Sequence, residues 1–143
     1  MGFLSQIFGK KRDYPPLAAS DPAAERLAEL KEPLEKLADE IPQALEIVPA
    51  AEAAYAFIGK PPKKFGVAWV DPEGKVHNFK TLVDEKGLSV VTLEKLSGEL
   101  KAAYERGEEE ERFSARLGEH EVVVTPSPRL AADISGIIQK YAN

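Results

Sequence analysis

The sequence contains no cysteine and only two histidines among its 143 residues. The lack of cysteine excludes disulfide bonds, thiol nucleophiles and thiolate metal sites. His77 and His120 each lack a second histidine at metal-ligand spacing, so no bound metal is expected. Glycine-rich phosphate loops, dinucleotide fingerprints, calcium loops and nucleophile elbows are missing from the sequence as well. The sequence therefore predicts a protein that is not an enzyme and holds no cofactor.

Long apolar runs are also missing. No segment approaches the roughly 20 apolar residues of a membrane-spanning helix, and the N-terminus lacks the pattern of a signal peptide. We therefore expect a cytoplasmic protein. The length predicts a single domain over 18–143, preceded by a tail over 1–17. The net charge of −5 argues against nucleic-acid binding.

The tail combines apolar and basic side chains. Its apolar residues fall on one helical face and are Phe3, Leu4, Ile7 and Phe8. Its basic residues follow directly and are Lys10, Lys11 and Arg12. A tail of this kind can dock in the groove of a partner protein or lie weakly on a membrane surface. Packing on its own domain, or on a dimer mate, is the alternative.

The most informative segment is a hairpin over 65–83. Its turn, Asp71-Pro72-Glu73-Gly74, has the residues of a type I turn closed by a glycine bulge. This turn predicts that Trp69 lies opposite His77, Val67 opposite Phe79, and Phe65 opposite Thr81. The bulky side chains share one side of the hairpin, which predicts that this side faces the core. They are Phe65, Val67, Trp69 and Phe79.

Trp69 and His77 are the pocket candidate of this hairpin. The usual state of such a pair is a partly buried imidazole packed on an aromatic ring. A small-ligand site or an enzyme would need a cavity around these two residues. His120, which closes a tight turn in the second predicted hairpin, is expected to be solvated.

Four lysines gather at one end of the predicted sheet. The loop 59–64 contributes three of them, and the hairpin register places the fourth beside Gly66. They are Lys60, Lys63, Lys64 and Lys80. This basic end is a candidate site for an anionic partner, while a solvated lysine-rich loop is the plainer interpretation.

Apolar spacing predicts the elements before the hairpin. A helix begins at Asp21 and Pro22 and ends before Pro42, and Pro33 kinks or splits it near Lys31. Its apolar seam consists of Leu27, Leu30, Leu34, Leu37 and Ile41. A strand over 53–58 follows, and 45–48 is a possible short strand.

After the hairpin, the sequence predicts a helix that Thr92 caps and Gly107 follows, and then an exposed acidic loop over 108–111. A two-residue turn, Gly118-Glu119, closes a second hairpin. Its predicted pairs are Leu117 with His120, Arg116 with Glu121, Ala115 with Val122, and Phe113 with Val124, and Phe113, Ala115 and Val122 face inward. Ser127 and Pro128 start a last helix, whose buried side holds Leu130, Ile134, Ile137, Ile138 and Tyr141.

The predicted order is helix, three strands, helix, two strands, helix. Such an order indicates an α+β fold, in which helices cover mainly one face of an antiparallel sheet. Over 21–143 this order of elements resembles that of type III secretion chaperones. The resemblance implies a small, acidic, cytoplasmic homodimer.

Our leading hypothesis is a non-enzymatic protein-binding or adaptor module, which forms a homodimer and in its sharpest version acts like a secretion chaperone. A peripheral membrane adaptor anchored by the tail is a second hypothesis. A small-ligand domain or enzyme with a pocket near Trp69 and His77 is a third.

Overall fold

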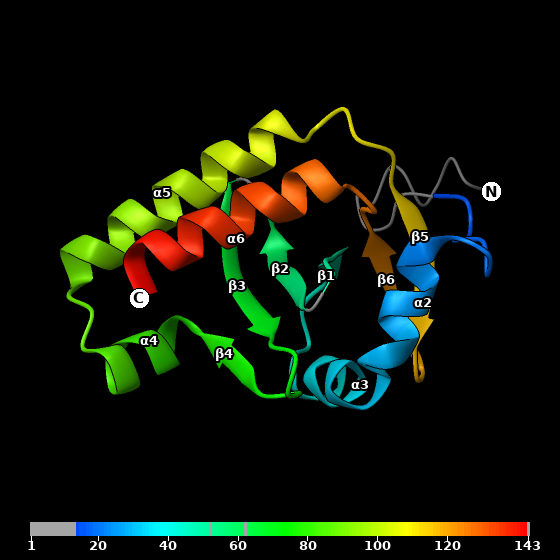
Figure 1. Ribbon diagram of the computed structural model, residues 1–143, viewed down its shortest axis with the longest axis horizontal. Helices are drawn as coiled ribbons and strands as arrows, with labels where there is room; N and C mark the ends of the chain where they lie inside the picture. The colour runs from blue at the N-terminus through cyan, green and yellow to red at the C-terminus, as the bar shows by residue number, and fades with distance from the viewer. Residues whose placement is uncertain (1–13, 52, 62, 143) are drawn as a thin grey trace.

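The computed structural model describes residues 14–51, 53–61 and 63–142, which form an α+β fold with a six-stranded sheet (Figure 1). The strands are β1 (Leu45–Pro49), β2 (Ala54–Lys60), β3 (Lys64–Val70), β4 (Val76–Asn78), β5 (Phe113–Leu117) and β6 (His120–Val124). The helices of the described residues are α2 (Pro22–Glu29), α3 (Lys31–Glu40), α4 (Phe79–Lys86), α5 (Val90–Arg106) and α6 (Pro128–Ala142). The predicted α+β class is confirmed.

The sheet is mixed, so the prediction of a purely antiparallel sheet is wrong. Its strand order is β4-β3-β2-β1-β6-β5, and β1 runs parallel to β6, with Glu46 beside Val123 and Ile47 beside Val124. All other neighbouring strands are antiparallel. The possible strand over 45–48 is β1, which lies between β2 and β6 inside the sheet. The chain therefore has four strands before α4, where three were predicted.

The first hairpin has the predicted register up to Asn78, where its second strand, β4, ends. Trp69 pairs with His77, and the backbone N–H of Asp71 donates to the carbonyl of Lys75 at 2.9 Å. Asn78 then caps α4, because its side chain accepts from the backbone N–H of Thr81 while the Thr81 hydroxyl accepts from the backbone N–H of Asn78. Phe79 and Thr81 are therefore helical, and their predicted pairing with Val67 and Phe65 is wrong.

Helices cover both faces of the sheet, which corrects the prediction that they cover mainly one. In β2, Tyr55 and Phe57 join the core beneath α5 and α6, whereas Ala54 and Ala56 join the core beneath α2 and α3. Figure 1 shows α5 and α6 side by side on one side of the strands and α2 and α3 on the other. The small side chains of the second face let α3 approach closely. Val67 and Trp69 are buried in the core beneath α5 and α6, and the partly buried Phe65 and Phe79 pack against it, so all four face the core as predicted.

Local signals set most helix ends. Pro33 divides the first predicted helix: α2 ends at Glu29, Leu30 leaves the helical conformation at φ −111°, and α3 begins at Lys31. Gly107 follows α5 as predicted. The start of α5 differs from the prediction, because Ser89 accepts from the N–H of Thr92 and extends the helix back to Val90.

The second hairpin has the predicted register throughout, from Leu117 beside His120 to Phe113 beside Val124. Gly118 makes this possible with φ +65°, which the first position of such a tight turn requires. On the outer edge of β5, Ser114 exchanges backbone hydrogen bonds with Pro15 and Leu17. The end of the predicted tail thus pairs with the sheet. Its residues 1–13, which include every predicted partner-binding residue of the tail, lie outside the described residues.

Replacing Leu34 with alanine tests whether the layer of α2 and α3 belongs to the folded core. Leu34 is fully buried between α3 and the sheet. We expect Leu34→Ala to lower the free energy of unfolding by about 2–5 kcal/mol, because the remaining cavity cannot fully collapse. Denaturant unfolding measures this change, with Leu30→Ala at the half-buried helix junction as the milder control. A decrease in the free energy of unfolding below about 0.5 kcal/mol would contradict the burial of Leu34 between α3 and the sheet.

Candidate functional site

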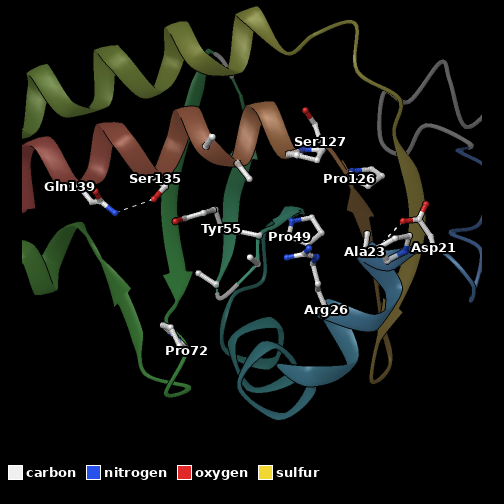
Figure 2. Close-up of a pocket in the computed structure, with 17 residues that line it drawn as sticks. Asp21, Ala23, Arg26, Pro49, Tyr55, Pro72, Pro126, Ser127, Ser135 and Gln139 are labelled. Atoms are coloured by element: carbon white, nitrogen blue, oxygen red, sulfur yellow. Dashed lines mark hydrogen bonds between the residues drawn. The ribbon is translucent and has the colours of Figure 1, made fainter.

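A cavity of about 730 Å³ lies between the N-terminal part of α2 and one face of α6 (Figure 2). We call it the α2–α6 cavity. The β1–β2 connection, the start of β2, the β3–β4 turn and the loop after β6 complete its wall. Among its 17 lining residues are five prolines and six alanines. The volume lies in the usual range of binding pockets, and the lining is mainly apolar.

The parallel pairing of β1 with β6 positions this cavity. Because the two strands point the same way, their carboxyl ends lie together, and the chain departs from them through Pro49 and Pro126, which both line the cavity. The exposed face of α6 adds Ala132, whose short side chain leaves the space open. Ser127 starts α6 by accepting from the N–H of Leu130 at 3.1 Å.

Two polar groups in the cavity have unused hydrogen-bonding capacity. Arg26 is half-buried, and within the part of the chain that the structure describes its guanidinium has no hydrogen bond or ion pair. Tyr55 is only 7% exposed, and its hydroxyl has no hydrogen-bond partner among the same residues. In contrast, Asp21 is engaged, because its carboxylate accepts from the N–H of Ala23 at 2.8 Å. The cavity therefore offers one cation and one phenol donor inside an apolar wall.

A second polar cluster lies around Glu46 on β1. The Glu46 carboxylate accepts from the Tyr104 hydroxyl at 2.7 Å, from Nε of Arg112 at 2.9 Å and from the Thr125 hydroxyl at 2.8 Å. Burial and the Glu46 charge raise the pKa of Tyr104 well above its usual value. Burial opposes the charge of Arg112, but the Glu46 carboxylate outweighs it and raises the pKa of Arg112. The cluster links β1, α5 and the chain after β6.

The Glu46 cluster serves the fold. The Arg112 side chain is 8% exposed, and its Nη1 donates to the carbonyls of Glu108 and Glu110, so it fixes the acidic loop 108–111. Arg112 Nη2 is the one buried side-chain nitrogen or oxygen without a partner in the described part of the chain. None of these residues lines the α2–α6 cavity or a second, smaller cavity between α2 and β5. We therefore treat the α2–α6 cavity, and not this cluster, as the candidate site.

The structure brings Trp69 and His77 together, as the sequence predicts. Their rings stack with centroids 5.5 Å apart and planes at 17°, and His77 Nε2 lies 2.9 Å from a carboxylate oxygen of Asp71. Burial opposes ionisation of Asp71, but hydrogen bonds from His77 and from the backbone of Lys75 and Glu73 outweigh it and lower its pKa. Neither residue of the stacked pair lines the α2–α6 cavity or the smaller cavity beside β5.

The predicted basic end is only partly assembled. Lys60, Lys63 and Lys64 are exposed where β2 turns into β3. Lys80, however, lies on α4 and pairs with Asp84 at 3.0 Å, so its predicted place in a strand beside Gly66 is wrong. The helical start at Phe79 is the physical reason. His120 is exposed, as the sequence predicts, and its Nε2 lies 2.8 Å from an Asp39 oxygen.

Sequence reasoning missed Arg26, Tyr55 and Glu46. Arg26 and Tyr55 belong to no motif, since a cavity lined by prolines and alanines leaves no recognisable spacing in the sequence. Glu46 does carry a signal, because it is a charged residue within the apolar run Leu45 to Val48. A carboxylate in that position needs a partner from elsewhere in the fold.

Comparisons with known proteins give no relative to guide the assignment. No protein-family model, curated protein or solved structure matches this chain. Among the described residues, no group of three or more histidine, aspartate or glutamate side chains is placed to hold a metal ion. The helices of that same part of the chain are too short or too polar to cross a membrane. The functional argument therefore depends on the cavity itself.

Removing the Glu46 carboxylate tests the second cluster. We expect Glu46→Leu to cost about 3–5 kcal/mol of stability, because it leaves the Arg112 charge buried and unpaired. Adding Arg112→Met should recover much of this loss, since an apolar pair of similar volume avoids the cost of burying charge. Denaturant unfolding of the single and double variants measures both effects. Equal losses in the two variants would contradict the pairing.

The raised pKa of Tyr104 gives a pH prediction. The folded protein holds the Tyr104 proton more tightly than the unfolded chain, so this stabilisation is complete below the ordinary tyrosine pKa of 10.0 and is lost as the pH rises above it. We expect wild type to be more stable than Tyr104→Phe by a constant amount between about pH 7 and pH 9. Above about pH 10 the difference should shrink. Denaturant unfolding across this range measures it, and a difference that persists to high pH would contradict the shift.

Proposed function

We propose that this protein is a non-enzymatic protein-binding module and that the α2–α6 cavity is where a segment of the partner docks. The observation that carries the proposal is the cavity of about 730 Å³ with its mainly proline and alanine wall. Apolar walls favour ligands that bury apolar side chains. A peptide segment supplies such side chains along a backbone that also needs hydrogen bonds.

The proline-rich rim supports a preformed site. The five prolines come from four parts of the chain and meet around the opening; they are Pro22, Pro49, Pro72, Pro126 and Pro128. Each proline ring fixes its own backbone dihedral, so the wall loses little conformational freedom when a partner binds. The preformed apolar α2–α6 cavity therefore supports a binding function better than a catalytic one, because catalysis needs reactive groups held close to one another.

Obstructing the cavity tests this function. Ala132 is exposed on the cavity face of α6, so Ala132→Trp fills the α2–α6 cavity without entering the core. Gly98→Trp is the control, because Gly98 is exposed on α5 and a Cβ added there meets nothing within 4 Å. We expect a partner retained from the native cells by wild type and by Gly98→Trp to be lost with Ala132→Trp.

Affinity purification with quantitative mass spectrometry gives this readout, and circular dichroism confirms that both tryptophan variants are folded. If Ala132→Trp retains the same proteins as wild type, the cavity is not the docking site. A partner lost equally with both variants would also argue against it, because the control changes a surface on a different helix.

A further inference from the structure

We propose that the partner segment carries a carboxylate side chain, flanked by apolar residues, and that this carboxylate pairs with Arg26 in the α2–α6 cavity. This inference rests on the proposed function and names the chemistry of its ligand. It starts from the contrast between Arg26 and the other arginines of the described residues.

Arg26 is the one arginine without a partner among the five that the structure describes. Arg106, Arg112, Arg116 and Arg129 all make side-chain hydrogen bonds, to Asp133, Glu46, the Glu119 carbonyl and Glu110 respectively. Arg26 makes none among the described residues, although it is half-buried in the cavity wall. A guanidinium has five N–H donors in a planar fork that matches a carboxylate. The unused donors of Arg26 therefore fit an acidic group supplied from outside.

The remaining wall favours a carboxylate over a phosphate. Asp21 lines the same cavity and brings a negative charge of its own. Arg26 is the one cationic residue among those that line the cavity, so it balances a single negative charge. A doubly charged phosphate would keep one unbalanced charge, which Asp21 repels. The surrounding prolines and alanines offer apolar contacts on either side of the ion pair, so residues next to the acidic one should be apolar.

The position of Arg26 points to a side chain within a segment. Figure 2 shows Arg26 between Asp21 and Pro126 on one side of the cavity and Pro72 and Gln139 on the other. Lining residues therefore continue in both directions from the guanidinium, and a bound chain can extend past it both ways.

Tyr55 supplies a second, independent contact. Its side chain is more than nine-tenths buried and lines the cavity, yet its hydroxyl has no partner among the described residues. Because Arg112 Nη2 is the one fully buried side-chain nitrogen or oxygen without a partner among the described residues, the Tyr55 hydroxyl is accessible from the cavity. A backbone carbonyl of a bound segment can accept a hydrogen bond from it there. In Figure 2 the hydroxyl of Tyr55 lies on the Ser135 side of the cavity, away from Asp21. Arg26 and Tyr55 would thus hold the segment at two separate points.

Selection from a random dodecapeptide display library tests the inference. Recovered peptides are synthesised with both ends blocked, and their binding is measured by fluorescence polarisation with the full-length chain. We expect wild type to select peptides with a glutamate or aspartate between apolar residues. Replacing that acid with its amide should weaken binding about tenfold or more, as expected for loss of a charge-assisted pair.

Charge reversal separates recognition from misfolding. Arg26→Glu should lose the acidic peptides and bind the same peptides with lysine in place of the acid, whereas Arg26→Lys should keep part of the acidic preference. Tyr55→Phe should weaken binding without changing the charge preference. A gain of binding by Arg26→Glu cannot come from an unfolded variant.

The outcomes distinguish this inference from the proposed function. The carboxylate assignment is overturned if the recovered peptides fail to bind Ala132→Trp but bind equally well without their acidic residue and bind Arg26→Glu as well as wild type. This result would leave the docking site in place. Binding that requires an unblocked C-terminus would overturn the assignment to a side chain. If no peptide is recovered, or if recovered peptides bind Ala132→Trp as well as wild type, both the inference and the docking site fail.

Discussion

The parallel pairing of β1 with β6 joins the two parts of the chain that build the candidate site. β1 belongs to the strands before α4, and β6 belongs to the hairpin that comes after α5. A parallel pair requires a long connection, and here that connection includes α4 and α5. Glu46 reinforces the junction from β1 by binding Tyr104 on α5 and Thr125 just after β6. Without this pairing, the end of β1 at Pro49 and the end of β6 at Val124 would not lie side by side. The part of the α2–α6 cavity wall that follows these two strands would then be missing.

The two-sided sheet explains why the cavity stays open. Large side chains from β2 and β3, such as Phe57 and Trp69, fill the space beneath α5 and α6, while alanines on the opposite side of the same strands admit α3. Each layer is therefore well filled over the middle of the sheet. At the edge where α2 and α6 begin, the lining is mainly proline and alanine, and too little side-chain volume is present to close the gap.

Local signals made much of the fold predictable, and long-range contacts account for the errors. Gly118 fixed the entire second hairpin, and Pro33 divided the first helix, because both act through their own backbone. Asn78 and Thr81 form a capping box inside a run that also suits a strand, so the start of α4 was missed. The β1–β6 pair and the α2–α6 cavity depend on residues far apart in the sequence. Neither Arg26 nor Tyr55 has a neighbour in the sequence that reveals its surroundings.

Arg112 and Arg26 show two uses of the same side chain. Arg112 is buried with its carboxylate, Glu46, and with two backbone carbonyls, so its charge is balanced within the fold. Arg26 keeps its charge at the edge of an apolar cavity, where the described residues provide no acceptor. No pairing within the described residues offsets the partial burial of this guanidinium. A partner that supplies the acceptor would explain the unpaired guanidinium of Arg26. We therefore expect an acidic ligand, although the protein itself carries a net charge of −5.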